Sequence, residues 1–557
     1  MTDAPSAQST DDAYLGFVRS ARARRFQRLA DEEFDLLVVG GGITGCGVAR
    51  DAVLRGLKVA LVERGDYASG TSSKSSRLVH GGIRYLEQLQ LGLVFESARE
   101  RAVLERLNPH LVWPQSFVIP GFTGDKHRLS VMGLGLWIHE ALSLFRSHGR
   151  PRRLTPDATS ARVPGLRREG LRGALHYWDC RTDDARLTLA NAMDAERHGA
   201  VTLNYARFEA LLQRPDGSVR GARIIDALDG RSVEVRCRHI AYAAGAFTDA
   251  LPSSPGEGKL LRVTRGTHIV LPRARLPVDD VVIMAAEDRR MVYAIPHFEV
   301  TYVGTTDTDH EAAPGPVVAT VDDVAYLLAA TNRSFPAAEI EPADIITTWA
   351  GLRPLIRDGA ATASRTSREH QRFDDPRGIT TIAGGKLTTY RSMAEEVVDA
   401  AASRLRGMGC EAGPCRSALL PLDPALPPAP PGAPDRDPTA HLWRNHGSGM
   451  VWVQERVRRV PTEGRPILPG FPWVFAQVSY AVAFEQATRL ADLMIRRLGI
   501  FYRAPDQGVA AAPAVAAHMA QALGLDAAWV RAELADYEAQ VRANRAAVEA
   551  LAETASR

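Results

Sequence analysis

The sequence lacks several features that would place the protein in a special class. Its 557 residues include only five scattered cysteines, which excludes a disulfide framework. No apolar run approaches the roughly 18 residues of a membrane-spanning helix. The best candidate, Val131 to Ile138, is short and is followed by His139 and Glu140. The formal charge of +3 gives no global reason to bind nucleic acid, so an ordinary soluble globular protein is expected.

We expect neither a secretory signal nor a metal site. Met1 to Ser9 are polar and lack the apolar stretch of a secretory signal. Cys410 and Cys415 are close together, but no second ligand pair accompanies them, so we expect free thiols and no metal site. A cytoplasmic location follows.

A βαβ unit begins at residue 35. The apolar run Leu36 to Val39 ends in three glycines, Ile43 to Gly56 has the pattern of a helix, and Lys58 to Glu63 is a second apolar run. The later runs His239 to Ala243 and Ile379 to Ile382 fit the same parallel sheet. Between these two runs, Val263–Leu271 and Met291–Gly304 alternate like antiparallel strands, which predicts an inserted second layer.

The glycine turn of this unit has the spacing of a dinucleotide site. Gly40 makes the tight turn, Gly42 lets backbone amides approach a pyrophosphate, and Gly45 allows close packing of helix on strand. Glu63 ends the next strand, where it would accept hydrogen bonds from ribose hydroxyls. The position of this turn at the start of a long, interrupted domain favours FAD over NAD.

The C-terminal third changes character. Residues 421–438 contain eight prolines, which no helix or central strand tolerates. Beyond them, helices are expected, one carrying the apolar stripe Ala487, Leu490, Ala491, Met494 and Leu498, and two or three more from Ala511 onward.

The segment Thr71 to Glu87, TSSKSSRLVHGGIRYLE, resembles the FAD-dependent glycerol-3-phosphate dehydrogenase family, part of the D-amino-acid-oxidase-like flavoproteins. Further matches follow in the family's order over about residues 35–400: Asp179–Cys180, Asp183–Leu187, Thr267–Val270, Gly304–Asp309, Gly351–Leu355 and Gly384–Arg391. The helical C-terminal part is similar to the family more loosely. Several long motifs in order are far more specific than the glycine turn alone.

The resemblance implies an α/β, Rossmann-like FAD-binding domain with an inserted antiparallel substrate-binding layer and an all-α C-terminal cap. The expected regions are the FAD-dependent oxidoreductase domain (34–410) and the helical cap (439–557), together with a basic N-terminal extension (1–33) and a proline-rich linker (411–438) that are not carried over from the family. The implied reaction is oxidation of sn-glycerol 3-phosphate to dihydroxyacetone phosphate, with FAD taking the hydride and electrons passing to a membrane quinone.

The same resemblance places the cofactor and substrate residues. FAD contacts are expected from Gly40, Gly42, Gly45, Glu63, Thr71, Ser72, Ser76, His80, Gly81, Gly82, Gly245, Gly385, Lys386, Leu387 and Thr388. A dianionic phosphate favours arginine, whose planar fork donates two hydrogen bonds. The candidates are Arg84, Arg353 and Arg368, with Tyr85 beside the substrate or the flavin. His268 is the candidate base, because histidine can accept the hydroxyl proton near neutral pH.

Three alternatives stay open at this point. An oxidase would use the same site with dioxygen as acceptor, a relative could oxidise an amino or hydroxy acid, and a non-catalytic flavin-fold module would bind without turnover. Membrane contact is expected to be peripheral, through Tyr14–Arg28 or the cap, with an anionic surface as the partner. Arg150–Arg153 could also touch anionic lipids, although a solvated loop is the simpler interpretation. A homodimer is compatible with the sequence.

Overall fold

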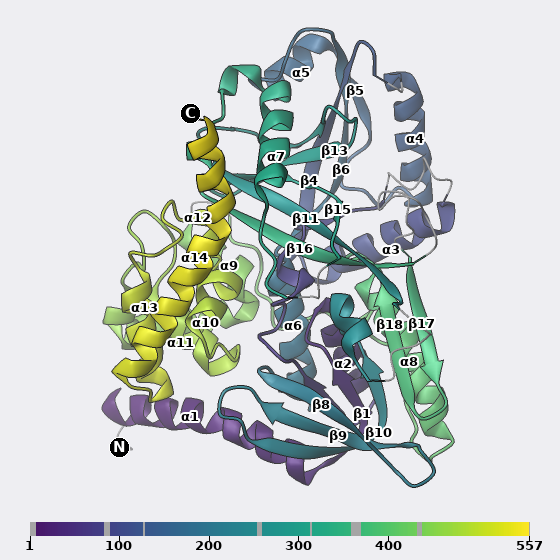
Figure 1. Cartoon of the computed structure of the whole chain (residues 1–557), viewed down its shortest axis with the longest axis vertical. Helices are drawn as coiled ribbons and strands as arrows, with labels where there is room; N and C mark the ends of the chain where they lie inside the picture. The colour runs from purple at the N-terminus through teal and green to yellow at the C-terminus, as the bar shows by residue number, and fades with distance from the viewer. Residues whose placement is uncertain are drawn as a thin grey trace.

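The computed structural model describes residues 7–82, 90–125, 128–252, 259–311, 315–357, 369–431 and 437–555. Two sheets stand one above the other, and the C-terminal helices lie along one side of both (Figure 1). The fold has the expected α/β domain, inserted sheet and helical C-terminal part.

The first sheet has eight strands and carries the glycine turn. Its order is β17-β18-β10-β1-β2-β7, with β9 and then β8 attached to β10. The strands β18, β10, β1, β2 and β7 pair in parallel. The bounds are β1 Glu33–Val39, β2 Val59–Val62, β7 Val201–Leu203, β8 Ala206–Gln213, β9 Val219–Asp226, β10 Ser232–Tyr242, β17 His370–Asp375 and β18 Ile379–Gly384. The apolar runs at 239–243 and 379–382 therefore lie in one parallel sheet, as predicted.

Helices α2 (Ile43–Leu54), α6 (Asp184–Arg197) and α8 (Tyr390–Arg406) pack with this sheet. Their buried side chains share one core with β1 and β2, including Leu36, Val48, Leu189 and Val397. This core holds the start of α2 and the start of α8 at the same end of the sheet, where the parallel strands finish.

The second sheet has ten strands in the order β15-β11-β14-β13-β12-β4-β6-β3, with β16 on β11 and β5 on β6. Its pairs are antiparallel except β4 with β12, so the predicted antiparallel layer is confirmed. The bounds are β3 Leu78–Val79, β4 Val112–Phe122, β5 Arg152–Leu154, β6 Leu171–Thr182, β11 Leu261–Pro272, β12 Val281–Ala285, β13 Met291–His297, β14 Val300–Gly304, β15 Thr308–Asp309 and β16 Thr347–Ile356.

Four helices accompany the second sheet. They are α3 (Leu91–Leu107), α4 (Leu129–Leu142), α5 (Pro156–Arg162) and α7 (Val321–Ser334). Thr320 caps α7 by accepting from the Asp323 amide, and Asp323 bonds back to the Thr320 amide. Helices α3 and α4 lie on the edge of the molecule opposite the C-terminal helices (Figure 1).

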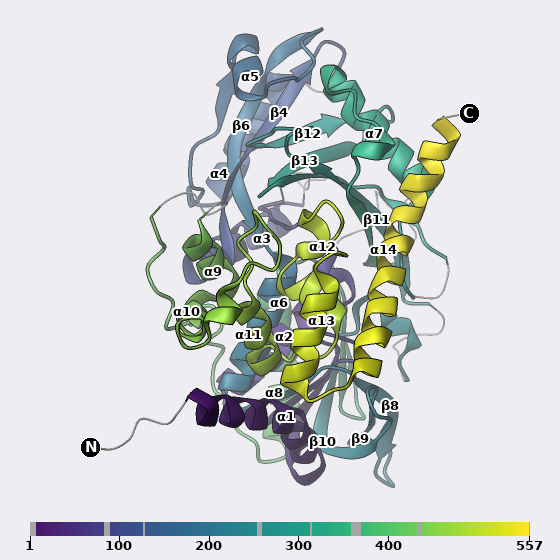
Figure 2. The ribbon, with the colours of Figure 1, turned by 90° about the vertical axis from the view of Figure 1, so that its left-hand side faces the viewer.

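The C-terminal part is helical, and its long last helix runs beside both layers (Figure 2). The predicted stripe is buried, but its helix begins only at Leu490, because Glu485 and Gln486 turn away to bind Arg186 and Asn204. From Ala511 onward there are two helices, within the predicted number. The bounds are α9 Pro438–His446, α10 Met450–Arg459, α11 Phe475–Phe484, α12 Ile500–Arg503, α13 Ala512–Leu523 and α14 Ala527–Ala555.

The arginine-rich N-terminal segment forms α1 (Ala7–Asp31), which joins the first sheet to the C-terminal helices. Leu29 is fully buried, Arg22 pairs with Asp226 at 2.8 Å, and the Tyr14 hydroxyl donates to the Ser479 carbonyl. This helix therefore packs on its own protein.

The proline-rich stretch contains no helix or strand over its described residues 411–431. It is nevertheless held against the first domain. Leu422 is 1% exposed, its amide donates to Asn108, and the Arg50 guanidinium donates to the carbonyls of Leu420 and Pro421. Among the described residues, no helix combines the length and apolar character needed to cross a membrane.

A buried ion cluster locks the C-terminal helices onto the first sheet. Asp66, just after β2, accepts two hydrogen bonds from Arg497 at 2.8 and 2.9 Å and one from Arg496 at 2.6 Å. Burial favours the neutral acid, but both guanidinium groups outweigh it and lower the pKa of Asp66 to about 2. The carboxylate therefore stays charged and paired at neutral pH.

Arg497→Met should lower the free energy of unfolding by about 3–5 kcal/mol, because it removes one partner of a buried pair. The matched control is Arg458→Met, whose side chain is 68% exposed and should change stability by about 0–1 kcal/mol. Urea denaturation followed by circular dichroism measures both. Equal stability of the two variants would contradict the locking role of Asp66.

Candidate active site

The glycine turn brings backbone amides close to where α2 begins. Gly40 has a φ of +116°, and a Cβ there would lie 2.5 Å from the Ala243 carbonyl oxygen. A Cβ on Gly45 would lie 1.8 Å from the Gly40 oxygen, so strand and helix touch through glycine alone. At Gly42 a Cβ would meet only the Ser72 hydroxyl, at 3.2 Å. The turn is therefore tightly packed at Gly40 and Gly45, whereas open space lies in front of Gly42.

The start of α2 has the chemistry of a phosphate site. Gly42, at the cap position, offers no side chain to the helix amides. The Ile43 amide donates to the Ser72 hydroxyl at 2.9 Å, so the loop of residues 71–82, which we call the serine-rich loop, lies directly against the helix end. The backbone amides at the helix end and the helix dipole together favour an anion in front of this turn.

Glu63 lies beside the same turn. Its carboxylate accepts from the amides of Gly41 at 2.6 Å and Gly65 at 2.8 Å. Burial raises the pKa of Glu63, opposed by these two hydrogen bonds. A carboxylate has about four lone-pair sites, so it retains acceptors for ribose hydroxyls. Gly245, three residues after β10, has a φ of +55° and open space where a Cβ would stand.

A second glycine turn joins β18 to α8. Gly384 and Gly385 have φ values of +75° and +88°, and half-buried Lys386 and Leu387 follow. The Thr389 side chain does not cap α8, so the helix again starts with amides unclaimed by its cap residue. This turn presents helix-end amides from a second direction.

The serine-rich loop meets this second turn at its far end. The His80 amide donates to the Thr388 hydroxyl at 3.3 Å, and the Gly82 amide donates to His80 Nδ1 at 3.2 Å. The Gly81 amide donates to buried Asp179. One loop thus connects both helix ends that face the predicted flavin site.

His268 lies on β11 directly opposite Gly304 of β14, where its ring occupies the space of a missing side chain. The ring stacks on Trp349 of β16, with centroids 4.6 Å apart and planes at 10°. Its Nε2 is 2.8 Å from the Ser76 hydroxyl. Its buried Nδ1 has no hydrogen-bond partner among the described residues.

The surroundings of His268 keep it neutral. Burial lowers the pKa of the imidazole well below its usual value, and the positive charges of Arg353 and Arg77 lower it further. The ring is therefore a proton acceptor at any pH near neutrality.

Arg353 reaches the same place from β16. Its guanidinium donates to the Thr306 carbonyl and the Asp307 carboxylate, both at 3.1 Å, and to the Thr305 hydroxyl at 2.9 Å. The side chain crosses Gly266 of β11, where a Cβ would collide with it. The segment that follows Gly304 therefore fixes the arginine near His268, with one-fifth of its side chain exposed.

Some predicted site residues lie outside the described residues, namely Arg84, Tyr85 and Arg368. Others have contacts that the sequence did not predict. The Thr71 hydroxyl donates to the Leu352 carbonyl at 2.6 Å, which ties the serine-rich loop to β16. Trp349 and Asp307 had no predicted role; Asp307 stands in the motif Gly304–Asp309, which was the available signal.

Comparison with known proteins identifies this arrangement. The model of the FAD-dependent oxidoreductase family matches residues 35–391, and that of the C-terminal domain of alpha-glycerophosphate oxidase matches residues 431–530. The aerobic glycerol-3-phosphate dehydrogenase of Staphylococcus epidermidis is 39% identical to this chain, over 68% of this chain and 69% of the relative. That of Staphylococcus aureus is 38% identical, over 70% of this chain and 71% of the relative. The chain belongs to the FAD-dependent glycerol-3-phosphate dehydrogenase family.

Solved structures agree with this family. The glycerol-3-phosphate dehydrogenase from Bacillus halodurans, complexed with FAD, has a TM-score of 0.77 and 29% identity, covering 95% of this chain and 98% of its own. The L-alpha-glycerophosphate oxidase from Mycoplasma pneumoniae, with FAD bound, has a TM-score of 0.52 and 18% identity over 69% and 96% of the two chains, which shows a shared fold.

FAD is the cofactor of this family, and the residues present fit it. The uncapped start of α2 and the open front of Gly42 suit the pyrophosphate, Glu63 suits the ribose, and the start of α8 suits the ring end that becomes negative on reduction. The serine-rich loop contacts the first and the last of these features, through Ser72 and His80.

Replacing Gly42 with tryptophan should give folded but colourless protein, because the new side chain would fill the open front of the turn. The ratio of flavin to protein absorbance measures FAD content, and circular dichroism checks the fold. The parent should release its flavin on acid precipitation, since no cysteine or histidine signal for a covalent link is present. Full FAD content in Gly42→Trp would contradict the assignment.

Proposed function

We propose that the protein oxidises sn-glycerol 3-phosphate to dihydroxyacetone phosphate and passes the electrons to a membrane quinone. The observation that supports it most is the meeting of Arg353 and His268 beside the FAD-binding loop. Arg353 suits the phosphate of the substrate, and His268 suits the proton of its hydroxyl group. The names of the 38–39% identical relatives point to the same substrate.

The phosphate would bind at Arg353. Its fork is already oriented by Thr305 and Asp307, so little side-chain entropy would be lost on binding. A dianion would compete with Asp307 for the guanidinium, since both anions form charge-assisted hydrogen bonds with arginine. Arg84 and Arg368 remain proposed partners of the phosphate.

The hydroxyl proton would pass to His268. When bound, FAD accepts the hydride that leaves the carbinol carbon. The neutral imidazole removes the hydroxyl proton, so that a hydride and a proton together leave the alcohol and a ketone remains. Ser76 and Trp349 hold the ring still, the first by a hydrogen bond and the second by stacking. Lys386, in the turn before α8, would add positive charge near the reduced ring.

Substrate binding would make His268 a better base. In the free protein the Arg353 charge is one of the causes that lower the pKa of His268. A bound phosphate dianion would offset that charge, so the pKa would rise in the complex. Charge on the substrate thus serves both affinity and proton removal.

The electron acceptor distinguishes the proposed dehydrogenase from the main alternative, an oxidase. An oxidase would use dioxygen with the same active site, whereas the dehydrogenase would use a quinone. Anaerobic mixing with glycerol 3-phosphate should bleach the flavin, and a quinone analogue should re-oxidise it faster than air does. Persistent yellow colour would favour a non-catalytic flavin module, and rapid re-oxidation by air alone would favour the oxidase.

Arg353→Lys should reduce kcat/KM for glycerol 3-phosphate by roughly ten- to a hundredfold, since a charged hydrogen bond contributes about 1.5–3 kcal/mol. Glycerol should be a poor substrate of the parent, because it lacks the phosphate that would bind Arg353. Near-parent kcat/KM in Arg353→Lys and Arg353→Ala would refute the assignment of the phosphate to Arg353. Equal turnover of glycerol and glycerol 3-phosphate by the parent would refute the substrate assignment.

His268→Ala should instead slow the reduction of the flavin by glycerol 3-phosphate while the FAD content stays unchanged.

The pH profile should show the coupling between the two residues. The acid limb of kcat/KM reports the free enzyme and should lie well below pH 6.5, because His268 must be neutral to act. The limb of kcat reports the complex and should lie at higher pH, because the phosphate offsets the Arg353 charge. Limbs at the same pH in both profiles would contradict the coupling.

A further inference from the structure

His268 rests on a group of aromatic rings that continues beyond the active site. Trp349, whose ring stacks on the imidazole, is 2% exposed. Two tyrosine rings meet the Trp349 ring at steep angles: that of Tyr302 on β14, with centroids 4.8 Å apart, and that of Tyr502 on α12, with centroids 5.3 Å apart. The aromatic wall behind His268, as we call these three rings, therefore joins the inserted sheet to a helix of the C-terminal part.

Arg77 of the serine-rich loop lies among the rings of the aromatic wall. Its guanidinium carbon is 4.8 Å from the ring centroid of Tyr502, 5.3 Å from that of Tyr302 and 5.8 Å from that of Trp349. A cation at these distances is attracted to the face of an aromatic ring. One planar cation is thus close to every ring of the wall.

The positive charge of Arg77 is loosely paired. The carboxylates of Asp183 and Asp184 are each 3.7 Å from its guanidinium, which is beyond hydrogen-bond distance. Asp184 instead accepts hydrogen bonds from the amide and the hydroxyl of Ser75. Arg77 donates to the Tyr302 hydroxyl at 3.3 Å. The two carboxylates therefore stabilise the charge without neutralising it at close range, so its field reaches the surrounding groups.

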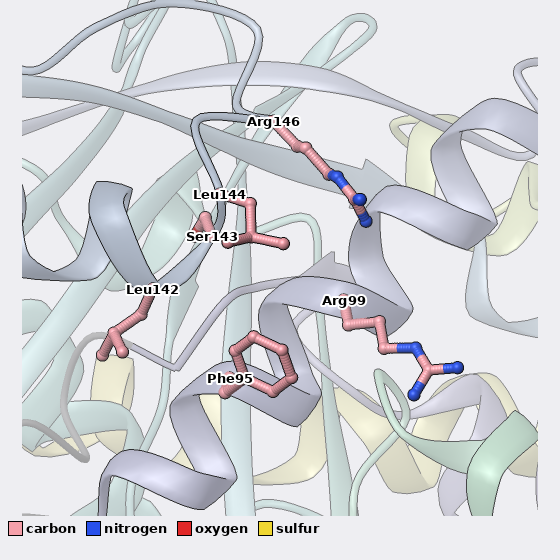
Figure 3. Close-up of a pocket in the computed structure, with 6 residues that line it drawn as sticks. All are labelled: Phe95, Arg99, Leu142, Ser143, Leu144 and Arg146. Carbon is pink, nitrogen blue, oxygen red and sulfur yellow. The ribbon is translucent and has the colours of Figure 1, made fainter.

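Protein groups enclose Arg77. Its side chain belongs to a residue that is 4% exposed, and its buried Nε has no hydrogen-bond partner among the described residues. The hollow of about 230 Å³ in Figure 3 lies apart from the aromatic wall, between α3 and the end of α4, and is lined by Phe95, Arg99, Leu142, Ser143, Leu144 and Arg146. Because water and dissolved ions screen a buried charge only weakly, Arg77 acts on its neighbours more strongly than a surface arginine would.

Two positive charges act on His268, that of Arg353 from β16 and that of Arg77 from the loop. After burial, they are the causes that lower the pKa of the imidazole. Burial opposes the charge of Arg77 as well, but the Tyr302 hydroxyl and the two carboxylates raise the pKa of Arg77 above its usual value. Arg77 therefore stays charged over the whole range in which His268 titrates. The titratable groups that face Arg77 are Asp183 and Asp184 at the start of α6, His297 of β13, Tyr302 of β14 and Tyr502 of α12.

We propose that Arg77 is a positioning residue for the removal of the hydroxyl proton: it holds the Trp349 ring in place against His268 and keeps a permanent positive charge near the base. The inference rests on the proposed role of His268. A bound phosphate would offset the charge of Arg353, whereas the enclosed Arg77 keeps its charge when the substrate binds. Arg77 thus keeps the imidazole neutral, and ready to accept a proton, in the complex as well as in the free protein.

Arg77→Met should let His268 take up a proton at higher pH, because one of the two positive charges near the imidazole is lost. Anaerobic reduction of the flavin in the holoenzyme by glycerol 3-phosphate, followed over a series of pH values, should show its acid limb at higher pH than in the parent. NMR titration of isotope-labelled histidine should show the same direction without substrate. The His268 signal is assigned by its absence in His268→Ala.

The matched control is Arg503→Met. Arg503 is also 4% exposed and lies over two aromatic rings, those of Phe298 and Trp473, but it pairs closely with Glu299 and is not among the charges that act on His268. Its acid limb and its histidine titration should match those of the parent.

Arg77→Lys separates the charge from the planar group. Lysine keeps a positive charge beside Asp183 and Asp184, but it loses the flat guanidinium that lies among the rings. The acid limb should therefore stay near that of the parent. The plateau rate of flavin reduction should fall by roughly tenfold at unchanged FAD content, because the ring behind the base is held less firmly.

An unchanged His268 titration in Arg77→Met, or an equal shift in Arg503→Met, would overturn the proposal. If Arg77→Met does not fold, a parent-like plateau rate in Arg77→Lys would overturn it. A parent whose flavin is not reduced by glycerol 3-phosphate would refute the proposed function instead, and the histidine titration would still decide whether Arg77 acts on His268.

Discussion

The serine-rich loop that follows β2 connects every part of the active site. Ser72 binds the start of α2, Thr71 binds β16, Ser76 binds His268 on β11, and His80 meets Thr388 before α8. The first and last of these contacts belong to the flavin domain, and the middle two belong to the inserted sheet. The position of the two glycine turns relative to His268 is thus set by hydrogen bonds from one loop.

The rest of the fold keeps these two sheets in register. Ser75 binds Asp184 at the start of α6, which fixes the loop to the flavin domain. The C-terminal helices contact both layers, through Asp66 on one side and through α14 against β16 on the other. Sliding of one sheet against the other would have to break the buried ion cluster. The helical part therefore acts as a brace for the site.

Sequence reasoning found what depends on local pattern. The glycine turn, the parallel runs and the antiparallel runs each have a period or spacing that the chain itself carries. It did not find Trp349 behind His268, because that contact depends on the pairing of β11 with β16, some 80 residues apart. It also extended the stripe around Leu490 into one helix, whereas tertiary contacts of Glu485 and Gln486 break the chain there.

The role of Ser76 tests the central claim most directly, since the sequence assigned it to the cofactor and the structure places it on His268. The measurement is the anaerobic rate of flavin reduction by glycerol 3-phosphate in Ser76→Ala. Loss of one hydrogen bond of about 1–1.5 kcal/mol should slow reduction by roughly tenfold while FAD content stays at the parent level. Lost FAD with an unchanged rate per bound flavin would contradict the account.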